Sequence, residues 1–365
     1  MAEIAALEKH PCAACGAQAE WNAARQRLVC PFCGTETPYQ VDTDTGKVQE
    51  LDLVAALRSL PDDARGWQTE RRSVQCQSCK AVMVYDPARV GQNCEFCGSP
   101  ALLDYQEIKA PIRPQSLLPF KITSGQVRDQ MRAWYAGRWF APNALKSRAL
   151  VDQVKGIYLP YWTFDAQADC PWTAEAGYYY YTTESYTDSQ GKRQTRQVQH
   201  VRWEPASGRI QHFFDDEPVC GSHGVDAQLV KGIEPFPTKE LVPYDTAYLS
   251  GYVVEHYQVV LVDAAKQARE EMNEELRVLC SREVPGDTQR NLQISPSYSG
   301  ETFKHILAPA WLMTYTYGSR VFQVVANGYT GAVAGHYPKS PWKIAGAVFL
   351  VIVIAIIVMV LVQQQ

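Results

Sequence analysis

The longest uninterrupted apolar stretch of the chain lies at its C-terminal end. Residues 344–362 are 19 positions without a charged side chain. At about 1.5 Å of rise per residue, a helix of this length covers roughly 28 Å, close to the hydrocarbon thickness of a bilayer. A buried core helix would carry polar positions and caps, whereas this stretch is interrupted only by Gly346. The pattern therefore predicts a transmembrane helix over residues 344–362.

The charges beside this helix predict its orientation. Lys339 and Lys343 precede the apolar stretch, and only glutamines follow it. Positively charged residues next to a membrane helix stay on the cytoplasmic side. The first residues, MAEIAALEKHPCAAC, lack the basic start and the apolar core of a secretion signal. We therefore expect a single-pass, tail-anchored protein of the cytoplasmic membrane whose N-terminal body lies in the cytoplasm.

Three further segments repeat apolar residues with helical spacing. We expect a short helix over residues 53–60, a second from Ser124 as its cap to about residue 139, and a third from Asp263 as its cap to about Cys280. The apolar faces of these helices comprise Leu53, Val54, Leu57 and Leu60; Val127, Met131 and Trp134; and Ala268, Met272, Leu276 and Leu279.

Alternating apolar and polar residues predict strands in the rest of the body. Residues 162–167 alternate in this way, and residues 177–203 indicate a hairpin with its tip at DSQGK. Gly318 and the pair Asn327-Gly328 mark two further turns. Together with the helices, these strands predict an α+β body.

Two pairs of short segments in this body resemble each other. LLPFKIT at residues 117–123 is similar to LVPYDTA at residues 241–247. YLPYWTF at residues 158–164 is similar to LAPAWLM at residues 307–313. The matches occur in the same order along the chain, which suggests that the body consists of two related halves.

Cysteines repeat with a much stricter pattern before residue 98. Eight of the 11 cysteines form four C-x-x-C pairs, and these pairs group into two units with identical internal spacing. The two units match at an offset of 64, and Trp21 aligns with Tyr85 and Phe32 with Phe96. The paired cysteines are Cys12, Cys15, Cys30 and Cys33 in the first unit, and Cys76, Cys79, Cys94 and Cys97 in the second.

Each unit has the form of a zinc ribbon. A C-x-x-C turn points two thiolates at one place, and two such turns joined by a hairpin complete a tetrahedral sulfur cage suited to zinc. We expect two structural zinc ions, because four thiolates leave no open position for a substrate, and each cage should fold locally with its metal. Redox disulfide pairs and an iron–sulfur cluster are the alternatives. Lys80 stands where the other turns carry glycine, which is tolerable if its φ angle is negative.

Charge and motifs narrow the function classes. The 35 Lys and Arg against 39 Asp and Glu give a formal net charge of −4, without strong segregation, which argues against long nucleic acid as the main partner. The chain has no phosphate loop, no G-x-G-x-x-G, no H-E-x-x-H and no G-x-S-x-G. These patterns favour a protein that is not an enzyme and has no small-molecule substrate or catalytic residues.

Three weaker candidates for chemistry remain. Cys220 and His223 lie in PVCGSHGVD and would form a nucleophile with a base, or a turn with a buried thiol. FFDDEP, at residues 213–218, would bind a cation or form a solvated acidic turn. Tyr178–Tyr181 with Arg193, Arg196 and Arg202 would bind single-stranded nucleic acid or form ordinary strand faces. In each case we favour the second, structural interpretation.

The motifs together resemble those of a known family. The ribbons CPFCG and CEFCG, the segments LLPFKIT, GIYLPYWTFDA, ILAPAW and VANGYTGAVAGHYPKSPWK, and the terminal helix are similar to bacterial tail-anchored tandem zinc-ribbon membrane proteins. Members are associated with phage-shock protein A-like and stomatin-like (SPFH) proteins, and are often labelled primosomal protein N' or replication factor Y. The resemblance implies a membrane adaptor in envelope-stress defence that holds such protein partners at the bilayer. The missing phosphate loop makes the helicase label doubtful here.

These expectations combine into one domain order. The first ribbon spans residues 8–38, a helical linker 39–71, the second ribbon 72–104, the α+β body 105–340 and the transmembrane helix 344–362; the two ribbons are called ribbon 1 and ribbon 2 below. The leading hypothesis is a non-enzymatic zinc-ribbon adaptor on the cytoplasmic face of the membrane. The alternative is a membrane-tethered, replication-associated protein that binds nucleic acid through its ribbons.

Overall fold

The computed structural model describes residues 10–36, 50–58, 72–85, 94, 96, 99, 102–104, 112–142, 154–187, 192–318 and 320–363. The strands are β1 (Glu20–Asn22), β2 (Arg27–Val29), β3 (Leu51–Asp52), β4 (Arg72–Cys76), β5 (Val82–Tyr85), β6 (Leu102–Asp104), β7 (Ser116–Leu117), β8 (Val154–Thr187), β9 (Arg193–Cys220), β10 (Val242–Pro243), β11 (Val253–Glu255), β12 (Thr288–Ile294), β13 (Ser297–Tyr317), β14 (Arg320–Asn327) and β15 (Val333–Gly335). The helices are α1 (Leu53–Arg58), α2 (Ser124–Ala136), α3 (Ala227–Lys231), α4 (Leu261–Glu283) and α5 (Pro341–Gln363), with the short 3-10 helices η5 (Thr238–Glu240) and η6 (Thr246–Leu249).

The fold is mixed α+β and consists mostly of strands, as expected. Within the described residues, one sheet has the strand order β10-β7-β13-β8-β11-β5-β4-β6, and β1 pairs with β2 in a separate hairpin. The central pair is β13 against β8, whose antiparallel register includes Leu307 opposite Pro160. Both strands are buried without interruption near this point, which is typical of strands covered on both faces.

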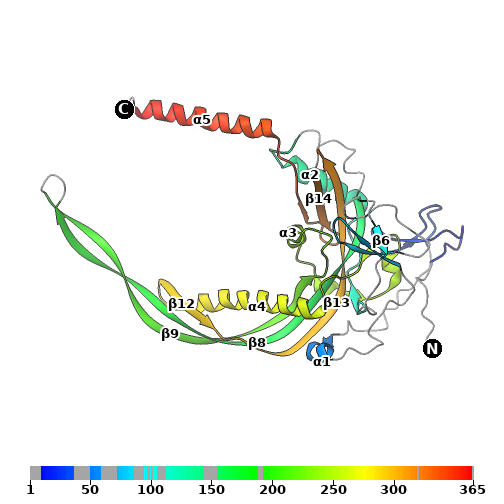
Figure 1. The fold of residues 1–365 in the computed structure, drawn as a ribbon, viewed down its shortest axis with the longest axis horizontal. Helices are drawn as coiled ribbons and strands as arrows, with labels where there is room; N and C mark the ends of the chain where they lie inside the picture. Colours follow the sequence, from blue (N-terminus) through cyan, green and yellow to red (C-terminus); the bar gives the residue numbers. More distant parts are fainter. Residues whose placement is uncertain are drawn as a thin grey trace.

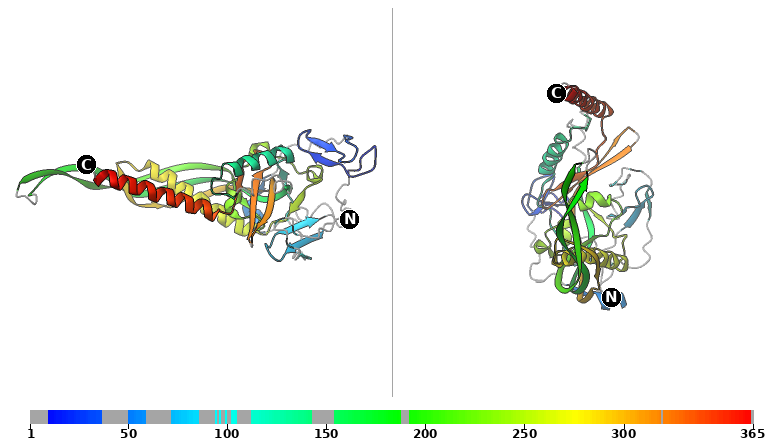
Figure 2. Two further views of the ribbon diagram at one scale, coloured as in Figure 1. Left: turned by 90° about the horizontal axis from the view of Figure 1, so that it is seen from above. Right: turned by 90° about the vertical axis from the view of Figure 1, so that its left-hand side faces the viewer.

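The two faces of the central pair carry different cores. Leu307 and Trp311 pack with Trp21 of ribbon 1, whereas Ile306 and Leu312 pack with residues of ribbon 2. Because neighbouring residues of a strand point to opposite faces, the two ribbons cover opposite sides of the sheet. Figure 2 shows this arrangement end-on, with the body between the two ribbons.

The most prominent feature is a long hairpin of β8 and β9, which we call the arm. Its strands pair from Tyr161 opposite Cys220 to Thr187 opposite Arg193, with one irregularity near Asp165. Figure 1 shows the arm projecting far beyond the body, with α4 lying along its base. Alanines at positions 166, 168 and 174 of β8 pack in the same core as α4. Their small side chains let the helix approach the strand closely. The sequence predicted the hairpin but not its length; most of the expected tip lies outside the described residues.

The predicted helices form, with corrections at their starts. α2 begins at Ser124, but its cap is Thr123, whose hydroxyl accepts from Gln126 N while Gln126 Oε1 accepts from Thr123 N. Tyr135 rather than Trp134 completes the buried face. α4 begins before Asp263, at Leu261, so Asp263 lies in its first turn. In α1 only Leu53 is buried, whereas Val54 and Leu57 are exposed; Leu60 lies outside the described residues.

The similar segments of the body are neighbours in the sheet. β7 pairs with β10, and the LPYW-type segments of β8 and β13 pair with each other in antiparallel register. β7 also runs parallel to β13, as β11 runs parallel to β8. The strand beside β8 is thus β11, and not β10, which contains the segment similar to that of β7. A common origin of the halves stays a prediction.

Candidate metal centres and membrane helix

The four cysteines of ribbon 1 converge on one point. The Sγ atoms of Cys12 and Cys33 lie 3.5 Å apart, as do those of Cys15 and Cys30. All four ligand atoms lie within 4.8 Å of one another, so this cluster could hold a metal ion. Each turn is closed by a glycine N–H group that donates to the first cysteine's carbonyl, from Gly16 at 2.8 Å and from Gly34 at 3.0 Å. Both glycines have φ of +72°, where a side chain would be strained.

The thiols of ribbon 1 affect one another's ionisation. The Thr35 hydroxyl, 3.2 Å from the Cys33 sulfur, lowers the pKa of Cys33 to about 6. The Ala17 N–H group favours the Cys15 thiolate, but Cys30 and Cys33 outweigh it and raise the pKa of Cys15 to about 12. Thiols packed this closely oppose one another's ionisation, and a divalent cation among them removes that opposition.

Ribbon 2 brings together the three of its cysteines that the structure describes. Cys76, Cys79 and Cys94 lie with their sulfurs within 4.8 Å of one another, and Cys79 Sγ is 3.6 Å from Cys94 Sγ. Cys97, the fourth predicted ligand, lies outside the described residues. This cluster too could hold a metal ion.

Lys80 departs from the expected backbone geometry. Its φ angle is +65°, not negative, so it occupies the same left-handed conformation as Gly16 of ribbon 1. The reason is the turn itself: the Lys80 N–H group donates to Cys76 O at 2.9 Å, as the glycine does in the turns of ribbon 1. The lysine therefore carries a conformational cost that ribbon 1 avoids.

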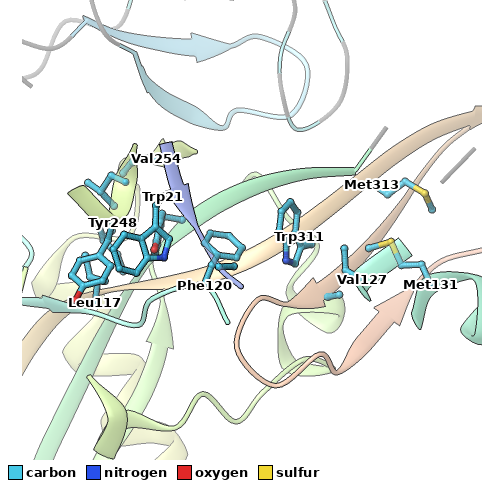
Figure 3. Packing of buried hydrophobic residues seen from close by; sticks show 14 of the residues in the cluster. Trp21, Leu117, Phe120, Val127, Met131, Tyr248, Val254, Trp311 and Met313 are labelled. Carbon is cyan, nitrogen blue, oxygen red and sulfur yellow. The ribbon is translucent and has the colours of Figure 1, made fainter. Parts of the chain in front are cut away.

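Ribbon 1 rests on the body through its hairpin. Trp21 is buried, and its ring centre lies 4.4 Å from that of Tyr248, next to Phe120 (Figure 3). The backbone N–H group of Trp21 donates to Ser250 O at 3.0 Å, and Gln26 Nε2 donates to Phe120 O at 2.7 Å. The second cysteine turn, which we call the knuckle, lies on the surface: Phe32 at its tip is 82% exposed.

Ribbon 2 is built into the body instead. Its strand β5 pairs with β11, with Val84 opposite Val254. Phe96, which aligns with Phe32, is fully buried, and its carbonyl accepts from Gln323 Nε2 at 3.2 Å and from the Thr314 hydroxyl. The same position of the repeat is thus a surface residue in one ribbon and a core residue in the other.

The C-terminal helix has the length and composition of a membrane span. α5 contains a stretch from Pro341 to Met359 with a mean hydropathy of 2.7, and none of it is buried against the protein. The N-terminal end of α5 is attached to the body: Ser340 N donates to Phe140 O, and Lys343 Nζ donates to Ala141 O, both at 2.8 Å. A single helix of this kind could span a membrane.

The Cys220 and His223 candidate lacks the features of an activated nucleophile. Burial raises the pKa of Cys220 to about 12, so the thiol is protonated at neutral pH. His223 is exposed, and its backbone N–H group donates to Gln258 Oε1 at 2.7 Å. The geometry fits a half-buried structural thiol at the end of β9.

The acidic segment at residues 213–218 lies within β9, beside the irregularity near Asp165, and is not the solvated turn that was expected. Asp216 forms a buried ion pair with Lys304 Nζ at 2.5 Å, and Asp165 and Glu50 lie 3.8 and 3.1 Å from the same nitrogen. Burial opposes the charge of Lys304, but these carboxylates outweigh it and raise the pKa of Lys304. Sequence reasoning missed this lysine; its signal is a single charge inside the apolar run TFKHILAPAW. Two members of the group Asp165, Asp215 and Asp216 therefore contact a lysine, and the third, Asp215, is exposed.

Comparison with known proteins adds one relative. The chain is 24% identical, over 320 residues, to the uncharacterized protein YdjG of Bacillus subtilis strain 168, covering 87% of this chain and 91% of that protein. No protein-family model and no solved structure matches the chain. The similarity extends over most of both chains.

Proposed function

We propose that the protein is a non-enzymatic adaptor that recruits protein partners to the cytoplasmic face of the membrane. Zinc would stabilise its ribbons, and a membrane helix would anchor it. The observation that carries the proposal is the exposed knuckle of ribbon 1: a closed cysteine cluster with a large apolar side chain, Phe32, presented to solvent. An exposed aromatic residue on a rigid turn is a typical anchor for a protein interface.

Zinc is the proposed metal for both clusters. In a tetrahedral site with Zn–S bonds of about 2.3 Å, sulfurs lie about 3.8 Å apart. The separations of 3.5 and 3.6 Å between paired sulfurs are close to this value. With four thiolates as ligands, zinc has no free coordination position, so its role would be structural.

The anchor in this proposal is α5, with Lys339 and Lys343 on the cytoplasmic side. The partners are coat-like proteins similar to phage-shock protein A and stomatin-like proteins, in a response to envelope stress. These identities come from the family resemblance.

The test is affinity purification of the tagged full-length chain from detergent-solubilised membranes, after nuclease treatment, with mass spectrometry of the bound proteins. Wild type is compared with Phe32→Ser and with a matched control, Trp139→Ser, which removes another highly exposed aromatic residue from outside the ribbons. We expect coat-like or stomatin-like proteins with wild type and Trp139→Ser, and about tenfold less with Phe32→Ser.

One result would contradict the proposed contact, and another the adaptor function itself. Equal recovery with Phe32→Ser would exclude the knuckle as the contact. A chain that carries no protein, but carries nucleic acid before the nuclease step with steep salt dependence, would favour the replication-associated alternative.

A further inference from the structure

Each cysteine turn of ribbon 1 has one buried and one exposed cysteine. Cys12 and Cys30 are buried, whereas Cys15 and Cys33 are exposed. Every residue from 31 to 34, in the knuckle, is also exposed. Small solutes can therefore approach Cys15 and Cys33 while the protein remains folded.

The described cysteines of ribbon 2 are less accessible. Cys76 and Cys94 are buried, and Cys79 is half-buried. Cys76 and Cys94 pack in the same core as Phe96 and residues of the body, and Cys94 Sγ lies 4.0 Å from Met83 Sδ. The same kind of cluster is thus open to solutes in ribbon 1 and covered by the body in ribbon 2.

The sulfurs of ribbon 1 pair across its two turns. Cys12 Sγ lies 3.5 Å from Cys33 Sγ, and Cys15 Sγ lies 3.5 Å from Cys30 Sγ. Each pair joins an exposed cysteine to a buried one. A disulfide bond is about 2.05 Å long, so each sulfur would have to move by roughly 0.7 Å to form one. Two such bonds would use all four cysteines of the cluster.

The shape of the knuckle depends on its cysteine cluster. Phe32 at its tip is 82% exposed, so packing of this ring against the body does not hold the turn. The backbone hydrogen bonds of the turn run from Gly34 N to Cys30 O and from Cys30 N to Thr35 O, at 3.0 and 2.9 Å. Both bonds involve a cysteine of the cluster. A loss of the cluster would therefore release the knuckle from its present shape.

We propose that ribbon 1 is an oxidation-sensitive site, at which a peroxide converts the four thiolates into the disulfides Cys12–Cys33 and Cys15–Cys30 while ribbon 2 stays reduced. No thiolate ligand for zinc is then left in ribbon 1. The site requires only the accessibility and the pairing of these sulfurs, and it does not depend on a protein partner.

The reaction balances with hydrogen peroxide as the oxidant. The Cys33 thiolate attacks one peroxide oxygen, the O–O bond breaks, hydroxide leaves, and the sulfur is oxidised to a sulfenic acid. The Cys12 thiolate then attacks this sulfur, the S–O bond breaks, hydroxide leaves, and the disulfide forms. A second peroxide oxidises Cys15 and Cys30 in the same way. In total, the four thiolates of the cluster, two peroxide molecules and four protons give two disulfides and four water molecules.

This site would regulate the adaptor, an extension that rests on the proposed function. Oxidation of ribbon 1 would change the surface around Phe32 and release a partner bound there. α5 and ribbon 2 take no part in the reaction, so the chain would stay anchored and its body folded.

The test exposes the purified, zinc-loaded, full-length chain in detergent to hydrogen peroxide. Free thiols are blocked with N-ethylmaleimide at successive times, and mass spectrometry identifies the disulfide-linked and the blocked peptides. We expect the disulfides Cys12–Cys33 and Cys15–Cys30, with release of about one zinc ion per chain. The cysteines of ribbon 2 should react about tenfold more slowly.

The chain contains a matched control pair. Cys170 Sγ and Cys280 Sγ lie 3.7 Å apart, nearly as close as the pairs of ribbon 1, but both cysteines are buried. This pair should stay reduced under the same conditions, because the reaction requires access as well as a short distance. Circular dichroism of the oxidised chain confirms that the body remains folded.

The outcomes separate the oxidation site from its regulatory role. Equal rates in the two ribbons, disulfides within a single turn of ribbon 1, or an equally fast disulfide between Cys170 and Cys280 would overturn the oxidation site. The affinity purification is then repeated with peroxide-treated membranes, where we expect about tenfold less partner. Selective oxidation of ribbon 1 with unchanged recovery of partners would overturn the regulatory role alone. A chain without partners before oxidation would overturn the proposed function and the regulation, but not the oxidation site.

Discussion

Ribbons 1 and 2 repeat one sequence pattern but stand in different relations to the body. Ribbon 1 packs on the body through one face of its hairpin, around Trp21. Its knuckle, with Phe32, is exposed. Ribbon 2 contributes strand β5 to the main sheet and buries the matching Phe96. One copy of the pattern is thus part of the main sheet, and the other keeps one cysteine turn accessible. We therefore expect stability to depend mainly on ribbon 2, and the proposed partner contact lies on ribbon 1.

The largest expected difference concerns the metal ligands. Cys94→Ser should lower the stability of the body by about 4 kcal/mol or more, a fall in Tm of about 8 °C or more, because strands β4–β6 of the sheet and the core around Phe96 depend on that cluster. Cys30→Ser should cost less than half of this, since it releases only the Trp21 contact. Differential scanning calorimetry measures the fall in Tm of both variants, and a zinc determination accompanies it. Equal falls in Tm would contradict the different structural roles of the two ribbons.

The aligned phenylalanines give a smaller but cleaner contrast. Phe96→Ala should cost about 3–5 kcal/mol, the usual cost of removing a fully buried phenylalanine side chain. Phe32→Ala should stay within about 0.5 kcal/mol, because its ring is exposed. Urea denaturation followed by tryptophan fluorescence gives both values. A large cost for Phe32→Ala would mean that ribbon 1 is also packed by its knuckle.

The rates of metal loss should follow accessibility. Cys15 and Cys33 are exposed, whereas Cys76 and Cys94 are buried and Cys79 is half-buried. A chelator should therefore remove one zinc about tenfold faster than the other, because release from ribbon 2 requires local opening of the body. A colorimetric zinc assay records two phases. In Cys30→Ser the fast phase should disappear; a single remaining fast phase would reverse the assignment.

The smallest effect concerns the strained lysine. Lys80→Gly should stabilise ribbon 2 by about 1 kcal/mol, because glycine adopts φ near +65° without a Cβ penalty. The reciprocal change, Gly16→Lys, should destabilise ribbon 1 by a similar amount. Thermal melts of the two variants test the pair, and a destabilising Lys80→Gly would show that the lysine side chain makes a compensating contact.

Local patterns in the sequence predicted local structure well. The cysteine spacing brings Cys12, Cys15, Cys30 and Cys33 together, and the apolar run forms α5, because each is decided within one short stretch of the chain. The helix faces of α2 and α4 follow the helical period of the apolar residues. Start positions were missed where a neighbour competes for the cap, as Thr123 does with Ser124.

Long-range features could not be predicted in the same way. The base of the arm is covered by α4 and β12, and Phe96 is held by Thr314 and Gln323, and all of these lie far away in the sequence from the residues they contact. The pairing of Lys304 with Asp216 likewise joins two strands that are distant in sequence. A pattern that repeats along a chain says nothing about which copy the rest of the chain will cover.

The pairing of β5 with β11 also sets an order of events during synthesis. Residues 82–85 leave the ribosome long before residues 253–255, so the Phe96 side chain and the free edge of β5 wait for their partners. A ribbon that has already taken up its metal can wait in a folded form and then serve as a template for the sheet. With zinc as the proposed metal, a shortage of zinc would affect newly made chains first, as a failure of maturation, and leave chains that are already folded intact.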